Sequence, residues 1–368
     1  TEGNLMNYEF RFQDPTSAST VYLFEAILAE VQSSIKWRGV FAFASQGGVE
    51  TLFEDPVVVD FLKSGELDLL LGVDAITNRP TLERLKGLAS QYPKFNVRVF
   101  WNRTTGLFHP KISFFQRRDG SKSLIVGSGN LTPGGLRENF EAYSILTASE
   151  KESLSIESWD DFIVRHRSDI REIDEEVLAR AARNVIRGGR RRRTEVEPDV
   201  PVDPEAAEDV GGKRVLVAQV PAASGRWHQV HFNKEAIDQF FRVHPNSLER
   251  AYLRERMADG SLGKEEARPC VYSESNKNHK IEVGAKAGAD YPTSGGPPVA
   301  VFRELQARTF EYMLLMPGEA GHRRMLALTG KLPAIGRGLK RVITDVGRLK
   351  EEWPNCPLLK PAATSAET

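Results

Sequence analysis

Residues 187–212 constrain the fold of this chain most, because their composition cannot form a packed core. The segment opens with five arginines in RGGRRRR and continues with seven acidic residues and three prolines. Segments with so few large apolar side chains stay extended in water. We therefore expect a linker here, between a first domain at 1–186 and a second domain at 213–368 that includes a C-terminal extension.

Charge is distributed unevenly over the chain, although the formal net charge of its 368 residues is zero. Residues 1–186 carry a net charge of −5, whereas residues 211–368 hold 24 lysines and arginines against 17 acidic residues. A basic second half predicts a polyanionic partner. The linker arginines fit either a phosphate-backbone contact or a solvated charge run, and the acidic part fits either a plain spacer or a mimic of nucleic acid that screens a basic groove.

Composition excludes several classes of protein. No apolar run approaches the roughly 18 residues of a membrane span, and residues 1–15 lack the basic and apolar regions of a signal peptide. Cys270 and Cys356 are the only cysteines, too few for a disulfide framework and unsuitably spaced for zinc. We expect a cytoplasmic protein without a membrane partner, a metal or a cofactor.

The first domain alternates helical patterns with short, fully apolar runs. Helices are expected at residues 20–36, 55–64 and 81–92, and strands at 39–45, 67–74, 96–101, 109–115, 123–128 and 140–146. Residues 159–186 form a charged amphipathic helix or a pair of helices. This alternation predicts an α/β fold with a sheet covered on both faces by helices.

The second domain is predicted to be rich in β-structure. Strands are expected at residues 214–221, 269–275, 280–285 and 310–317, and helices at 233–241 and 337–352. Asn233 stands where a helix N-cap is needed. The role of residues 318–368 is open.

His109 and Lys111 are the first residues that suggest chemistry. They are two positions apart in a predicted strand, so their side chains point to the same face. A lysine binds the non-bridging oxygens of a phosphodiester, and a histidine can attack phosphorus or transfer a proton. The alternative is a structural histidine at the core or edge of the sheet, because this triplet also occurs by chance.

Three residues further along extend this pattern. Ser128 and Asn130 lie in a glycine-rich turn, where the backbone can approach a ligand closely, and Glu141 falls inside the next strand. A buried carboxylate is costly unless it has a partner. We expect His109 to be that partner, with Glu141 orienting its ring as the carboxylate of a Ser-His-Asp triad does.

The complete pattern resembles the phospholipase D superfamily, whose half-motif is His-x-Lys, then Ser-x-Asn, then Glu. The matching residues are His109, Lys111, Ser128, Asn130 and Glu141. The longer form of the motif has an aspartate five residues after the lysine, where this chain has Gln116. That departure disfavours the lipase and transphosphatidylase branches and is compatible with the nuclease branch. The resemblance implies a phospholipase-D-like mixed sheet flanked by helices.

The chain carries this half-motif once, since none of the other six histidines is followed two residues later by lysine. The family's active site needs two copies, so the resemblance implies a homodimer with a site shared across a two-fold axis. One histidine would form a phosphohistidine intermediate while its mate protonates the leaving oxygen, without a metal. The lysines and asparagines would stabilise the transition state.

Two polar arms in the second domain, at residues 224–233 and 273–280, resemble those of a barrel-like B3 domain that binds DNA. Such a domain follows the nuclease domain in metal-independent restriction endonucleases of the BfiI and NgoFVII type. The implied DNA-binding residues are Ser224, Arg226, Trp227, Gln229, Asn233, Asn276, Lys277 and Asn278, with Lys280 and Lys286 on phosphates. The alternative for the first arm is a polar loop over a half-buried tryptophan.

We therefore expect a sequence-specific endodeoxyribonuclease of the type II restriction class that acts on double-stranded DNA. A second possibility is a nuclease subunit that needs a separate helicase or ATPase, since the chain has no GxxxxGK motif followed by Ser or Thr. A phospholipase D-type lipid hydrolase is a weaker alternative, because Gln116 replaces the aspartate, residues 1–15 do not resemble a signal peptide and the second half is basic. A DNA-binding protein with a relic site would have lost His109, Lys111, Asn130 or Glu141, and all four are present.

Overall fold

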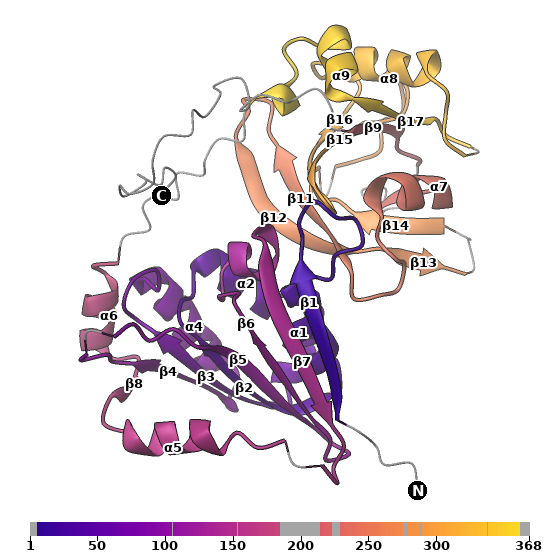
Figure 1. The fold of residues 1–368 in the computed structure, drawn as a ribbon. Helices are drawn as coiled ribbons and strands as arrows, with labels where there is room; N and C mark the ends of the chain where they lie inside the picture. Colours follow the sequence, from indigo (N-terminus) through magenta and orange to yellow (C-terminus); the bar gives the residue numbers. More distant parts are fainter. Residues whose placement is uncertain are drawn as a thin grey trace, which may run out of the picture. The chain divides into compact units, whose positions relative to one another are not determined.

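The computed structural model describes residues 6–104, 106–152, 154–184, 214–222, 229–274, 278–286, 289–336 and 338–360. The chain separates into two compact units, Thr1–Arg187 and Gly188–Thr368 (Figure 1). The predicted linker at 187–212 lies outside the described residues. None of the described helices is long and apolar enough to cross a membrane.

The first unit is built on an eight-stranded mixed sheet with the strand order β1-β7-β6-β5-β2-β3-β4-β8. Only the β2–β3 and β3–β4 pairs are parallel. The strands are β1 (Asn7–Gln13), β2 (Ser34–Phe41), β3 (Glu66–Gly72), β4 (Phe95–Phe100), β5 (Lys111–Arg117), β6 (Lys122–Gly127), β7 (Glu141–Ala148) and β8 (Ile170–Glu172). The central strands are apolar because both of their faces are buried.

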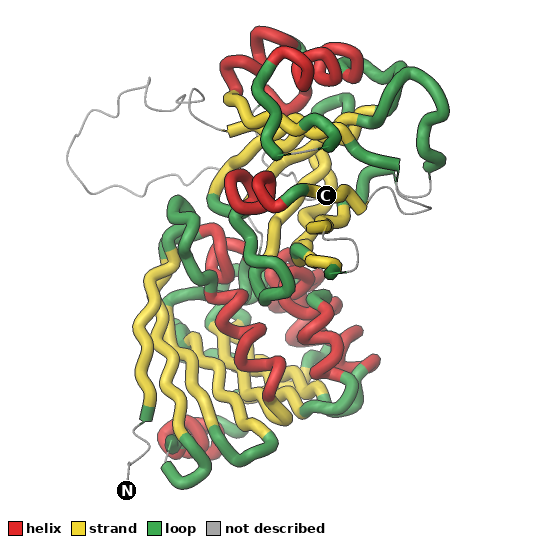
Figure 2. The backbone as a smooth tube through the Cα atoms, turned by 90° about the vertical axis from the view of Figure 1, so that its right-hand side faces the viewer, coloured by secondary structure: helices red, strands yellow, loops and turns green. Residues whose placement is uncertain are grey.

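Helices cover one face of this sheet fully and the other in part (Figure 2). On the first face, Trp37 and Phe115 stack on each other, and Trp37 also stacks on Phe53 from α2. On the second face, Trp159 and Phe162 from α5 pack over β2, β3 and β4. The helices are α1 (Leu23–Ser33), α2 (Gln46–Phe53), α3 (Pro56–Leu62), α4 (Arg79–Gln91), α5 (Glu157–Arg165) and α6 (Glu175–Ala181).

The sequence predicted most of these elements, with three corrections. The helix expected at 20–36 ends at Ser33, because Ser34 is already extended and pairs with Arg117 in β5. Strand β1, helix α2 and strand β8, which falls inside the helical segment expected at 159–186, were not expected. The prediction of a sheet covered on both faces is wrong for β1 and the neighbouring parts of β6 and β7, where the second face stays open.

The second unit contains a six-stranded sheet and a three-stranded sheet, of order β12-β11-β16-β15-β9-β17 and β10-β14-β13. The strands are β9 (Arg214–Gln219), β10 (Gln229–Phe232), β11 (Arg250–Arg256), β12 (Leu262–Pro269), β13 (Val271–Ser273), β14 (Asn278–Glu282), β15 (Val299–Gln306), β16 (Thr309–Leu315) and β17 (Arg341–Asp345). The helices are α7 (Lys234–Ala236), α8 (His322–Lys331) and α9 (Val346–Glu352). A π-helical turn at Ile237–Phe241 continues α7.

Two apolar clusters lie on opposite faces of the six-stranded sheet. One joins β10 and β14 to it through the rings of Phe232, Phe241 and Phe302. The other packs α8 and α9 against it. The basic helix expected at 337–352 is instead strand β17 followed by α9, because the apolar residues of β17 pair with β9. The barrel-like B3 architecture stays a prediction.

Candidate active site

The half-motif residues meet at one end of the eight-stranded sheet. Lys111 is the first residue of β5 and Glu141 is the first residue of β7, while Ser128 follows the last residue of β6. Because β5, β6 and β7 are antiparallel neighbours, these positions share an edge. His109 lies just before β5 rather than within it, so its loop and not the strand's alternation places its ring.

The His109 ring is in contact with the ammonium group of Lys111. Lys111 Nζ lies 2.9 Å from Nδ1 and 3.0 Å from Nε2 of His109, and it donates to the His109 carbonyl at 3.0 Å. The edge of the Phe43 ring supports the imidazole from another side, with centroids 5.6 Å apart. The His109 side chain is exposed, whereas the Lys111 side chain is buried.

The electrostatics of this pair favour a neutral imidazole. Partial burial lowers the pKa of His109 below its ordinary value, and the positive charge of Lys111 lowers it further. Burial also lowers the pKa of Lys111, while the negative charge of Glu141 opposes that change. A neutral ring beside a cation can attack an electron-poor phosphorus whose oxygens the cation binds.

Glu141 is held by two side chains of its own protomer. The Ser128 hydroxyl donates to one carboxylate oxygen, and Asn139 Nδ2 donates to the other at 3.2 Å. Ser128 Oγ also accepts from the Ala142 N–H at 3.1 Å. The predicted hydrogen bond from His109 to Glu141 does not form among the described residues of the single chain.

Asn130 is held by a hydrogen bond from the backbone just after β2. Its side-chain oxygen accepts from the Phe43 N–H at 3.2 Å, which leaves the amide group as a donor at the same edge of the sheet. The turn before it needs glycine, because a Cβ at Gly129 would lie 2.5 Å from the carbonyl oxygen of Gly135. Gly135 belongs to a π-helical turn at Gly134–Glu138, a local distortion found often at functional sites.

Two residues that support this site, Gln13 and Asn139, were missed by sequence reasoning. Gln13, the last residue of β1, pairs with Glu141 in the ladder and is fully buried. Its amide donates to the Asn139 carbonyl at 2.9 Å and accepts from the Leu23 N–H at 2.9 Å. It therefore fixes the loop that carries Asn139. The polar–aromatic alternation of NYEFRFQ was the available signal for this strand.

The predicted DNA-binding residues of the second unit are described only in part. Ser224, Arg226, Trp227, Asn276 and Lys277 lie outside the described residues. Gln229 begins β10 and Asn278 begins β14. The two strands are antiparallel, with Gln229 opposite Glu282 and Phe232 opposite His279, so the two arms enter this ladder from opposite ends.

The described DNA-binding candidates differ in whether their side chains already bind another residue of the chain. Asn233 caps α7 by accepting from the Ala236 N–H at 3.1 Å, and its amide donates to the Ile335 carbonyl at 2.8 Å. Lys286 has a left-handed backbone and forms an ion pair with Glu319 at 2.5 Å. Lys280 lies in β14 opposite His231, whose pKa is lowered by burial and by the positive charge of Lys280.

Among the described residues, no group suited to a metal ion accompanies the site. The part of the chain that the structure describes holds no cluster of three or more His, Cys, Asp or Glu side chains that could bind one. The donors at the site are an imidazole, an ammonium and an amide beside a single carboxylate. Such a set binds phosphate oxygens directly.

Comparison with known proteins gives only distant likenesses. No family model and no curated protein matches the chain. Among solved structures, it is similar to Nuc from Salmonella typhimurium, a phospholipase D family member, at 14% identity and a TM-score of 0.33, over 45% of this chain and 97% of that one. NucT from Helicobacter pylori gives 11% identity and a TM-score of 0.33, over 46% and 100%.

A third likeness is to the N-terminal domain of Helicobacter pylori LlaJI.R1. It has 9% identity and a TM-score of 0.25, and it covers 36% of this chain and 97% of that one. Because these scores are low, the functional assignment depends on the side chains of this chain.

Proposed function

We propose that this chain is a metal-independent endodeoxyribonuclease of the phospholipase D superfamily, with His109 as its nucleophile. The observation that carries the proposal is the contact of the exposed His109 imidazole, whose pKa is lowered by burial and by Lys111, with the Lys111 ammonium, at an end of the sheet that also holds Asn130 and Glu141. A structural histidine has no need of an adjacent cation that lowers its pKa.

The reaction proceeds in two displacements. A ring nitrogen of His109 attacks phosphorus, a P–N bond forms, and the P–O bond to the leaving nucleoside breaks. A second histidine, protonated as an imidazolium, gives the departing oxygen its proton and becomes neutral. That histidine then removes a proton from water, which attacks phosphorus and breaks the P–N bond. Lys111 binds the non-bridging oxygens, and the Asn130 amide donates to the charge that develops on them.

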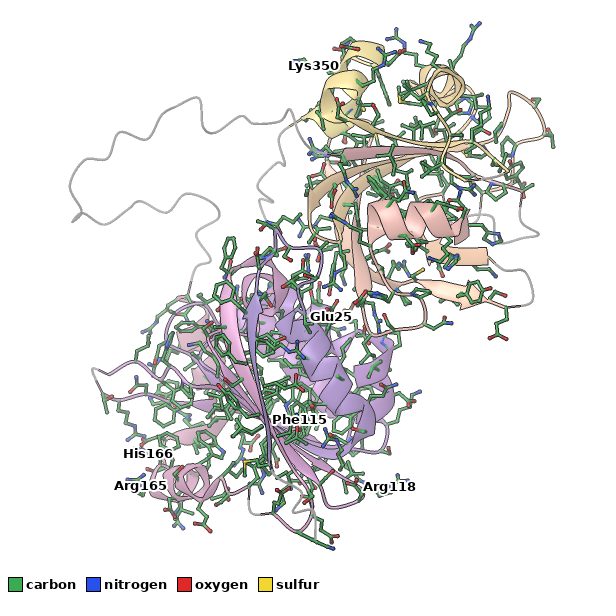
Figure 3. The ribbon with its side chains drawn as sticks, turned by 45° about the vertical axis from the view of Figure 1, so that its right-hand side comes forward. Glu25, Phe115, Arg118, Arg165, His166 and Lys350 are labelled. Carbon is green, nitrogen blue, oxygen red and sulfur yellow. The ribbon has the colours of Figure 1, made fainter. Side chains whose placement is uncertain are left out.

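We infer that the second histidine comes from another copy of the chain, because none of the other six histidines is followed two residues later by lysine. In the first unit the only other histidine is His166, which follows α5 beside Arg165 (Figure 3). The ring of His166 packs on Phe162 and contacts Asp169 at 3.4 Å. It therefore lies beside the apolar cluster under α5 and not at the site that holds His109. We infer a homodimer in which each protomer supplies one histidine, one lysine and one asparagine.

The basic second unit supports double-stranded DNA as the substrate. Its arms at 224–233 and 273–280 carry the Arg, Gln and Asn side chains that read bases in the major groove. We propose sequence-specific cleavage of the type II restriction class. A nuclease subunit that works with a separate helicase or ATPase is the second candidate, because its site would be the same. A phospholipase D-type lipid hydrolase lacks support from this charge distribution.

The test is incubation with long DNA of diverse sequence in EDTA, followed by sequencing of the ends. Discrete ends are expected from the wild-type protein and from His166→Asn, and none from His109→Asn. A smear of ends would exclude sequence specificity. Cleavage by His109→Asn, or no cleavage by the wild-type protein in EDTA, would overturn the proposed chemistry.

A further inference from the structure

An apolar face of the eight-stranded sheet is left open in the first unit. Strand β1 presents Tyr8, Phe10 and Phe12 to solvent, with 60%, 60% and 58% of their surfaces exposed. These residues alternate along the strand, so all three rings lie on one side of the sheet. Single exposed aromatic residues are ordinary on protein surfaces, but three in a row on an edge strand are not.

The same face continues across the neighbouring strands. Phe10 is opposite Ser144 in β7, and Ser144 is opposite Val126 in β6, which is 42% exposed. The Tyr8 hydroxyl lies 3.1 Å from Ser144 Oγ, as expected for side chains on a common side. We call the set Tyr8, Phe10, Phe12 and Val126 the aromatic face.

Helix α5 packs over β2, β3, β4 and the start of β5, and the segment before it, with Leu154 and Ile156, covers Phe114, Leu124 and Leu146. The aromatic face lies beyond both and stays exposed. Beside it lies an apolar cavity of about 140 Å³, at the border between the covered and the open halves. The cavity is lined mainly by Ile112, Phe114, Leu124, Val126, Ile156 and Trp159. An exposed row of rings next to a hollow of this kind suits a contact in which each partner offers both parts.

We propose that a second copy of this chain packs on the aromatic face and so completes the active site. The inference rests on the proposed function, which requires a second half-site. It is tied to the site by position, since Phe12 is followed by Gln13, the residue opposite Glu141. Strands β1, β6 and β7 therefore end or begin at the site and also carry the open face.

Of the two two-fold arrangements considered, only one brings the two active sites to the same end of the dimer. Pairing of two β1 edges as antiparallel neighbours would place the two sites at opposite ends of a seven-residue ladder, about 20 Å apart along the strands. Stacking of the two faces about an axis parallel to the strands places both sites at the same end, with sheets about 10 Å apart. In this arrangement Phe10 of each protomer faces the cavity of the other.

The charges around the aromatic face disfavour nucleic acid as the occupant. Arg11 points to the other side of β1 and pairs with Glu9 at 2.5 Å. The four side chains of the face carry no positive charge, whereas phosphate backbones are bound chiefly by lysine and arginine. An apolar, aromatic surface without charge is typical of the centre of a protein–protein interface.

The test is sedimentation equilibrium of the full chain, with cleavage measured on the same samples. The wild-type protein should be a dimer, and Phe10→Asp should raise the dimer dissociation constant about 30-fold or more and reduce cleavage at concentrations where it is monomeric. Ile35→Asp is the matched control, because Ile35 is also a strand residue and 41% exposed, but it lies in β2, four strands away from β1 in the sheet. It should leave the dimer unchanged.

Disulfide cross-linking tests the same interface without depending on the folding of the Phe10→Asp variant. Phe10 and Val126 lie two strands apart, about 10 Å, which is too far for a disulfide within one chain. Chains carrying both Phe10→Cys and Val126→Cys should cross-link to each other under mild oxidation, and the single variants should not. The native Cys270 and Cys356 are buried and do not interfere.

The outcomes separate this inference from the proposed function. A Phe10→Asp protein that is folded and as dimeric as the wild type overturns the inference and leaves a shared site possible through another surface. A monomeric wild type that cleaves DNA overturns both. A dimer that Phe10→Asp dissociates, but that never cleaves DNA, supports the interface and overturns the nuclease. Unchanged mass with weakened DNA binding assigns the face to nucleic acid and refutes the inference.

Discussion

Lys111 Nζ lies within 3.0 Å of both ring nitrogens of His109, so the ammonium group sits over the imidazole rather than at its edge. This position lowers the pKa of His109, together with burial, and it brings a charge suited to phosphate oxygens next to the proposed nucleophile. Ser128 and Glu141 bind each other, and Asn130 accepts from the Phe43 N–H, all within the same protomer. Among the described residues, His109 forms no hydrogen bond to the carboxylate of Glu141.

Replacement of His109 by alanine should reduce cleavage in EDTA by at least about 10³-fold, because the covalent route is lost. Binding of a DNA duplex should change little, since the basic second unit is untouched. Nicking of plasmid DNA and a gel-shift titration measure the two effects. Cleavage that survives in His109→Ala, while His166→Ala behaves like the wild type, would remove the proposed nucleophile.

The pH profile of cleavage should report the lowered pKa of His109. Because burial and Lys111 lower that pKa below its ordinary value of 6.5, the neutral ring persists as the pH falls, and the acid limb of kcat/KM should lie below pH 6.5. Lys111→Met removes the positive charge, so the remaining activity should have an acid limb at higher pH. Lys86→Met, an exposed change on α4, should keep the wild-type profile. An acid limb that stays in place in Lys111→Met would contradict this coupling.

The turn that carries Asn130 should not tolerate a side chain at Gly129. A Cβ there would lie 2.5 Å from the Gly135 carbonyl oxygen, so Gly129→Ala should destabilise the first unit by about 1–3 kcal/mol and lower cleavage. Gly87→Ala is the control, since nothing lies within 4 Å of its Cβ in α4 and alanine favours helix. Urea unfolding measures both variants, and equal stability of the two would refute the packing argument.

Recognition of DNA should depend on the first arm more than on Lys286. Arg226→Ala should weaken binding to the recognised sequence by about 1–3 kcal/mol, as the loss of a bidentate base contact does. Lys286→Ala should have a smaller effect, because Glu319 already holds that ammonium group. The measurement is the ratio of specific to non-specific affinity at fixed salt. An unchanged ratio in Arg226→Ala would exclude the arm as a reader.

Sequence reasoning succeeded where a pattern is local and failed where a contact is long-range. The strands at 67–74 and 96–101 were predicted correctly because strands buried on both faces read as continuous apolar runs. Strand β1 was missed because it is an edge strand whose aromatic side is exposed. Spacing predicted that His109 and Lys111 lie together, although the loop before β5 places His109. The contact of Gln13 with the Asn139 loop joins residues 126 positions apart, so no local pattern shows it.

The pairing of β1 with β7 also sets the order in which a usable site can appear during synthesis. More than a hundred residues separate the two strands, so their ladder closes late and against a large loop entropy. A growing chain exposes His109 and Lys111 well before Glu141 leaves the ribosome. Until β7 arrives, Gln13 has no ladder partner and the glutamate is absent. An unfinished chain therefore carries the proposed nucleophile without the rest of its half-site, so the proposed cleavage would have to wait until the unit is whole.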